Sequence, residues 1–292
     1  MNPEELLVEI VENHESLEYF EKNFKAIKKA MNDFSDSMYI ECLYYVRDYL
    51  IYKEMWKDYQ KLLSKGISIA DKKNDYSKGA IFYNDLAAIT ESLKTAEKYY
   101  LKSIELYQKA GDSVESCLAQ LDLAYTYGEN QSYDKAFSCY DDVYEKSLLL
   151  KNSEITINTL ISRATLHREK GFEDKEALEC YEESLKISSQ LDDEELVYDI
   201  LYNIALTTFS LSLWERNAEV NLLLFDIMEK NEMADEMIVT ALDIHRVFSK
   251  LDRLDDAKPF IKKAYESLES AQEIDEEFKK GIENLYKALI KP

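Results

Sequence analysis

The stretch AYTYGENQSYDKAFSCYDDV, residues 124 to 143, decides the fold. It sets two small residues, Ala124 and Ala136, twelve positions apart, with Tyr127 between them and Tyr140 four positions after the second alanine. Side chains three or four residues apart lie on one face of a helix. The polar run between the alanines supplies turn residues. The stretch therefore predicts two antiparallel helices whose backbones approach closely where the alanines meet.

The same spacing returns along the chain. The alanine of the second helix recurs at intervals of 40, 41, 41 and 39 residues, as Ala96, Ala136, Ala177, Ala218 and Ala257. The preceding helix carries its own small residue, as Ala87, Ala124, Ala164 and Ala205, with His245 in that position in the last copy. A fixed period of this length indicates stacked helix-pair repeats.

The amino-acid composition favours helices and limits the chemical class of a binding partner. Of 292 residues, 46% are apolar and only 6 are Gly and 3 Pro, which predicts an all-α protein. The formal net charge of -22 opposes binding to nucleic acid or to anionic lipid, because the negative electrostatic field of the protein repels phosphate groups. The N-terminus is acidic where an export signal needs positive charge, and the longest uncharged stretch is shorter than the roughly 20 residues that span a bilayer. We expect a cytoplasmic protein with no direct nucleic-acid or membrane partner and an undetermined oligomeric state.

No motif for catalysis is visible. The four cysteines form no CxxC pair, the three histidines are scattered, and the sequence contains no GxGxxG, phosphate-binding loop or HExxH. We therefore expect no enzyme activity, cofactor or metal. A nucleophilic site that the fold assembles from distant residues stays open at this level.

The repeat resembles the tetratricopeptide repeat (TPR) family. In the best copy, Leu123, Ala124, Tyr127, Ala136 and Tyr140 match the consensus positions at consensus spacing. Units of about forty residues are similar to the longer variants in kinesin light chains and in bacterial peptide-pheromone receptors of the Rap and PlcR type. The resemblance implies a right-handed superhelical solenoid of antiparallel helix pairs.

The domain organisation follows from where the repeat is visible. Residues 1–75 read as divergent helix pairs rich in tyrosine, 76–272 as about five TPR-like repeats, and 273–292 as a helix that caps the last repeat. Ser270 and Glu273 predict a capping box at the start of that terminal helix.

The resemblance also implies a binding surface, because the first helix of each pair lines the concave groove in this family. The position two residues before the small residue holds Asp85, Asp122, Ser162, Asn203 and Asp243 in successive repeats, and Asn84, Tyr125 and Tyr202 adjoin that row. Such carboxylates and amides can hold a peptide backbone and attract Lys or Arg. The alternative is that these side chains contact only solvent and bind no partner.

Two functions fit this surface. The first is a non-enzymatic protein whose groove captures a neutral-to-basic peptide or protein segment, as a peptide-responsive regulator. The alternative is a constitutive scaffold or chaperone-like adaptor in a multiprotein complex. Acidic residues concentrate in residues 112–199, with 21 Asp+Glu against 8 Lys+Arg, which either favours a basic partner or reflects solubility.

Overall fold

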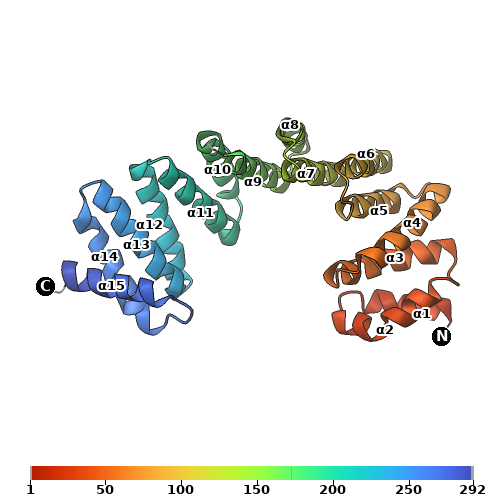
Figure 1. Cartoon of the computed structure of the whole chain (residues 1–292), viewed down its shortest axis with the longest axis horizontal. Coiled ribbons are helices and arrows are strands. Elements are labelled where there is room, and N and C mark those ends of the chain that lie inside the picture. The colour runs from red at the N-terminus through yellow and green to blue at the C-terminus, as the bar shows by residue number, and fades with distance from the viewer. Residues whose placement is uncertain (1, 172, 291–292) are drawn as a thin grey trace. The chain divides into compact units, whose positions relative to one another are not determined.

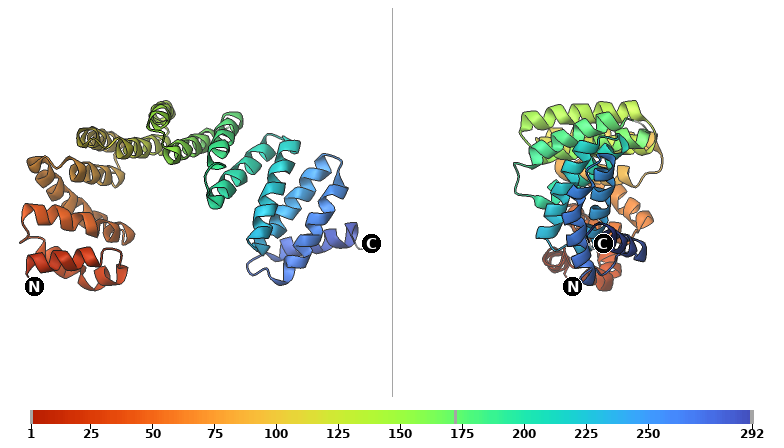
Figure 2. Two further views of the ribbon diagram at one scale, coloured as in Figure 1. Left: turned by 180° about the vertical axis from the view of Figure 1, so that it is seen from behind. Right: turned by 90° about the vertical axis from the view of Figure 1, so that its left-hand side faces the viewer.

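The computed structural model describes residues 2–171 and 173–290 (Figure 1). These residues hold fifteen α-helices, one short 3-10 helix and no strand. The chain divides into two compact units, Met1–Lys151 and Asn152–Pro292. The helices of residues 36–150 and those of residues 153–266 pack consecutively against one another as antiparallel pairs, and the first two helices of the chain both pack against the third; two further views show the helices (Figure 2). The predicted all-α, TPR-like solenoid of helix pairs is therefore confirmed.

Unit 1 contains four helix pairs. Two helix pairs precede residue 76, the second of them rich in tyrosine, and α1 begins at Pro3 with a capping box formed by Asn2 and Glu5. The helices are α1 (Pro3–Glu12), α2 (Leu17–Ala30), α3 (Asp36–Tyr52), α4 (Trp56–Lys73), α5 (Tyr76–Ala88), α6 (Leu93–Ala110), α7 (Ser113–Glu129) and α8 (Tyr133–Leu150).

Unit 2 contains three helix pairs and a terminal helix. Its elements are α9 (Ser153–Lys170), α10 (Asp174–Ser188), α11 (Glu194–Ser210), α12 (Trp214–Lys230), α13 (Ala234–Lys250), α14 (Leu254–Glu266), the 3-10 helix η1 (Ser267–Glu269) and α15 (Glu276–Leu289).

The small residues lie where helices meet. All nine alanines that define the repeat are buried, and Ala124, Ala136, Ala164, Ala177 and Ala257 have no exposed surface. Tyr127 and Tyr140 are buried beside them. The buried alanines and tyrosines of the repeat thus stabilise the fold, because they remove apolar surface from water between closely spaced helices.

In the tyrosine-rich pairs a glycine takes over this role. A Cβ added at Gly66 of α4 would lie 2.5 Å from Leu43 Cδ2 and 3.2 Å from two ring carbons of Phe82. Leu43 belongs to α3 and Phe82 to α5, so at Gly66 α4 lies against side chains of two helices, and an added Cβ would force the Leu43 side chain to shift.

The terminal helix α15 covers α13 and α14. Tyr286 of α15 stacks on Tyr265 of α14, with ring centroids 3.9 Å apart and an interplanar angle of 9°. The predicted capping box is wrong, because α15 begins at Glu276 with Asp275 as its N-cap. The backbone N–H groups of Gln272 and Glu273 instead donate to the carboxylate of Asp235 in α13, at 3.1 and 3.2 Å. The segment before α15 is thus bound to α13.

The close approach at Gly66 leads to a test that compares one substitution in two helices. Gly66→Ala should lower the free energy of unfolding by about 1–3 kcal/mol, because the added methyl has no room beside Leu43. Gly281→Ala in α15 should raise it by about 0.5–1 kcal/mol, because its Cβ would meet Leu242 at an ordinary 3.5 Å and alanine favours the helix. Urea unfolding of both variants measures this, and a shift of the same sign in both would contradict the assigned contact.

Candidate functional site

A cavity of about 600 Å³ opens in unit 1 between α3, α5 and α7. We call it the groove pocket. It lies along the first helices of three successive pairs, with Tyr107 from the end of α6 and Asp112 from the following turn. Its lining residues are Tyr44, Arg47, Ser77, Ile81, Asn84, Asp85, Tyr107, Asp112, Glu115, Leu118, Ala119 and Asp122. Three of the predicted ligand-binding residues, Asn84, Asp85 and Asp122, therefore share one cavity.

Asp85 is buried at the base of the groove pocket, with 8% of its surface exposed. Its two carboxylate oxygens accept hydrogen bonds from Arg47 Nη2 at 3.1 Å and from Tyr59 Oη at 2.5 Å. Burial raises the pKa of the Asp85 carboxyl, while Arg47 and the Tyr59 hydroxyl both lower it. The carboxylate is thus engaged within the protein, and it links α3, α4 and α5.

Asn84 and Asp122 join α5 to α7 at the exposed side of the groove pocket. Asn84 Nδ2 donates to Asp122 Oδ2 at 2.8 Å. Among the described residues, the buried Asn84 Oδ1 has no hydrogen-bond partner. A buried acceptor without a partner carries a desolvation cost.

Carboxylates dominate the charge of the groove pocket. Asp112, Glu115 and Asp122 line it, and its only basic lining residue, Arg47, is paired with Asp85. Desolvation raises the pKa of Glu115, the charges of Asp112 and Asp122 raise it further, and the charge of Arg47 lowers it. Desolvation also raises the pKa of Asp122, although the hydrogen bond from Asn84 opposes this. Such an environment favours a positively charged ligand group.

The remaining predicted residue of unit 1 lies outside the groove pocket. Tyr125 follows Ala124 on α7 and is 62% exposed. Its ring offers contact area to a ligand at low entropic cost.

In unit 2 the predicted residues do not gather into a carboxylate pocket. Ser162 on α9 is half-buried. Asn203 on α11 donates to the Asp199 carbonyl of its own helix at 2.9 Å. Asp243 on α13 accepts from Arg246 Nη1 at 3.2 Å, and burial raises its pKa while Arg246 lowers it.

The exposed face of α11 is apolar instead. Tyr202 is 51% exposed, and Leu206 and Phe209 follow it at spacings of four and three residues on the same face. The Arg246 guanidinium lies 5.6 Å from the centroid of the Phe209 ring. We call Tyr202, Leu206 and Phe209 the α11 stripe.

Sequence reasoning missed several of these residues. Leu206 follows its small residue Ala205 as Tyr125 follows Ala124, so the repeat itself could have found it. Arg47 lies where the repeat pattern is not visible, and Asp112 and Glu115 line the cavity only because α7 begins beside α6. No local pattern marks those three.

Catalytic and metal chemistry find little support in the described residues. Burial raises the pKa of the Cys42 thiol to about 12 and also raises those of Cys117 and Cys139, so these thiols are protonated and weakly nucleophilic. Within residues 2–171 and 173–290, no three His, Cys, Asp or Glu side chains are placed to hold a metal ion. In the same residues no helix has the length and apolar character to cross a bilayer.

Comparison with known proteins finds solved structures with a similar fold. No protein-family model and no curated protein matches the sequence. Among solved structures, a Signal Transduction ATPase with Numerous Domains that has a tetratricopeptide repeat sensor, from Pyrococcus horikoshii, is similar with a TM-score of 0.68 at 16% identity. The match covers 92% of this chain and 42% of that protein, so the chain spans less than half of its length.

Two further solved structures share the fold. The apo form of RapI gives a TM-score of 0.60 at 14% identity, covering 99% of this chain and 82% of RapI. The apo form of the quorum sensor NprR from B. thuringiensis gives a TM-score of 0.50 at 16% identity, and the match covers 90% of this chain and 86% of NprR. The structural neighbours are thus TPR-like repeat proteins, as the sequence pattern predicted. At such low identity the likeness concerns the fold alone.

The contacts of Asp85 predict a loss of stability when its carboxylate is removed. Asp85→Ala should lower the free energy of unfolding by about 2–3 kcal/mol, because Arg47 and the Tyr59 hydroxyl lose their partner. Tyr59→Phe should cost about 1 kcal/mol. Asp122→Asn, at an exposed carboxylate of the same pocket, should change stability by less than about 0.5 kcal/mol. Chemical denaturation of the three variants measures the order, and an Asp85→Ala variant as stable as Asp122→Asn would contradict the structural role of Asp85.

Proposed function

We propose that this chain is a non-enzymatic binding protein whose groove pocket captures a neutral-to-basic polypeptide segment. The observation that carries the proposal is the charge of this pocket, where Asp112, Glu115 and Asp122 face a cavity whose one basic residue is already paired. A Lys or Arg side chain of the segment supplies the missing positive charge. The segment's backbone N–H groups can donate to the carboxylates that line the pocket.

The long-range charge supports the same ligand class. With a formal net charge of -22, the protein attracts basic segments and repels acidic ones during encounter. At the groove pocket itself, each charge-assisted hydrogen bond to a partly exposed carboxylate contributes about 1 kcal/mol. Several such contacts along one segment give useful affinity, because each 1.4 kcal/mol corresponds to about a tenfold change in Kd.

Within this proposal the protein is a cytoplasmic regulator that responds to its peptide. The support is the shared architecture with a protein that has a tetratricopeptide repeat sensor and with a quorum sensor. Helix-pair stacks suit this role, because each repeat contacts only its neighbours and small changes in packing accumulate along the stack.

The alternative is a scaffold that joins two proteins without responding to either. The α11 stripe favours it, because unit 2 exposes an apolar surface where unit 1 exposes an acidic one. Surfaces of different chemistry suit two different partners. A regulator changes its solution radius when its peptide binds, whereas a scaffold keeps it.

Neutralising two groove carboxylates tests the proposed function. The pair Glu115→Gln and Asp122→Asn should weaken binding of the captured segment about tenfold or more, because two charged acceptors become neutral. The control pair Glu129→Gln and Asp134→Asn changes the net charge equally at two exposed positions of unit 1 outside the groove pocket. Affinity capture with mass spectrometry identifies segments that the native and control proteins retain, and calorimetry with a synthetic copy gives Kd. An acidic segment, or equal affinity in all three proteins, would refute the proposal.

The raised pKa values of the groove carboxyls predict how binding depends on pH. Because the pKa values of Glu115 and Asp122 lie above the usual values, both groups take up protons at a higher pH than ordinary carboxyls. The ionised forms bind the basic segment, so affinity should be full near neutral pH and fall as the pH is lowered toward about 5. The Glu115→Gln and Asp122→Asn pair should lack this dependence. Calorimetry at constant ionic strength measures it, and a pH profile that the two substitutions leave unchanged would argue against these carboxyls.

A further inference from the structure

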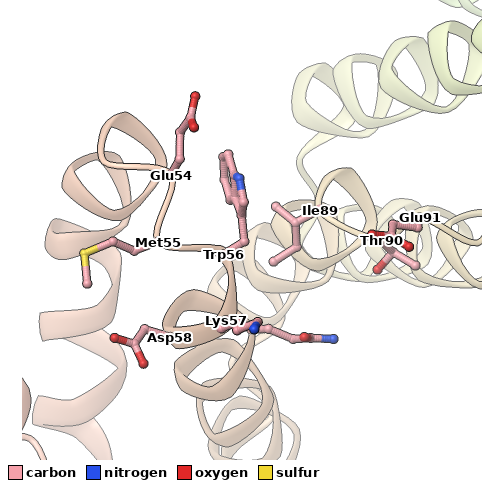
Figure 3. Close-up of a pocket in the computed structure, with 9 residues that line it drawn as sticks. Glu54, Met55, Trp56, Lys57, Asp58, Ile89, Thr90 and Glu91 are labelled. Carbon is pink, nitrogen blue, oxygen red and sulfur yellow. The ribbon is translucent and has the colours of Figure 1, made fainter.

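A second cavity of unit 1 lies where the turn between α3 and α4 meets the turn between α5 and α6 (Figure 3). Its volume is about 780 Å³, and we call it the Trp56 pocket. It shares no lining residue with the groove pocket. The residues that line it are Glu54, Met55, Trp56, Lys57, Asp58, Gln60, Ile89, Thr90 and Glu91.

An exposed tryptophan is the main feature of this cavity. Trp56 is the first residue of α4, and 42% of its surface is exposed. Its indole stands between Glu54 and Ile89 (Figure 3). Met55 and Ile89 pack against the core cluster of unit 1, so the surroundings of the ring are firmly held. An exposed Trp on a rigid support is typical of the residues that dominate protein interfaces.

The charged residues around the ring define what it can bind. Asp58 is paired with Lys28, with Lys28 Nζ 2.6 Å from Asp58 Oδ2. Glu54 and Glu91 form no ion pair with any residue that the structure describes, and they lie on either side of the indole and Ile89 (Figure 3). Lys57 is the only basic residue of the lining. One available carboxylate, that of Glu54, thus lies beside the exposed aromatic ring, and a second, that of Glu91, lies beyond Ile89 (Figure 3).

We infer that the Trp56 pocket is a docking site for an arginine-bearing segment of a protein partner. The guanidinium lies over the Trp56 indole and donates to Glu54, its aliphatic stem contacts Ile89, and Glu91 beyond Ile89 adds negative charge at the other end of the pocket. Arginine fits better than lysine because its planar group stacks on an aromatic ring and is weakly hydrated. The net charge of -22 disfavours a second copy of this chain as the occupant. This site goes beyond the proposed function, since it lies outside the groove pocket.

The experiment follows the indole N–H resonance of Trp56 by NMR while a peptide is added. The probe is acetyl-Gly-Leu-Arg-Leu-Gly-amide, and its control replaces arginine with citrulline, which has the same shape without the charge. We expect a saturable shift of Trp56 with the arginine peptide and at least fivefold weaker binding of the citrulline peptide. The indole of Trp214, which packs on Phe209 with ring centroids 5.5 Å apart, serves as the reference and should not respond.

Variants locate the binding. The pair Glu54→Gln and Glu91→Gln should reduce affinity for the arginine peptide about fivefold to tenfold, to the level of the citrulline peptide. The groove variant Glu115→Gln and Asp122→Asn should give the same shift of the Trp56 resonance, with the same affinity at the Trp56 pocket, as the native protein, so failure of the proposed function would leave this result unaffected. Equal binding of both peptides, no response of Trp56, or a Trp56 shift that depends on protein concentration without peptide would each overturn the inference. The last outcome would assign the pocket to self-association.

Discussion

Close approach between helix backbones is the constraint on which the structure depends. It requires a residue with almost no side chain at each contact, and the chain supplies alanine at most contacts and glycine where α4 passes between α3 and α5. Large neighbours such as Tyr140 and Phe82 fill the space beside these contacts. Because each first helix is fixed by its second helix in this way, α3, α5 and α7 stand close enough together to enclose the groove pocket.

Within that pocket the carboxylates divide into two kinds. Asp85 is buried and holds three helices together through Arg47 and Tyr59, whereas Glu115 and Asp122 face the cavity. The buried carboxylate of Asp85 forms an ion pair with Arg47, the only basic residue that lines the pocket. Arg47 is therefore already paired and does not take the place of a basic ligand group. The acidic character of the surface therefore depends on an ion pair beneath it, and stability and ligand preference share residues.

The same helical repeat carries different surfaces in the two units. In unit 1 the equivalent helix positions present Asn84, Asp85 and Asp122, and in unit 2 α11 presents Tyr202, Leu206 and Phe209. The exposed positions are free to differ because the fold is specified by the buried stripe of each helix. A repeat architecture can thus combine an acidic pocket, an apolar stripe and an exposed tryptophan at the turns without any change in its core.

The sequence by itself determined the helix pairs, their period and the positions of the small residues, because these depend on local spacing that repeats about every forty residues. The sequence also placed Asn84, Asp85 and Asp122 on first helices of neighbouring repeats, and these three residues line one cavity. Only the tertiary structure decided which of them remains available to a ligand. Arg47 and Tyr59 reach Asp85 from helices 38 and 26 residues earlier in the chain, and Asp235 fixes the segment before α15 from 37 and 38 residues away. Such pairings depend on how side chains meet across packed helices, which local spacing does not encode.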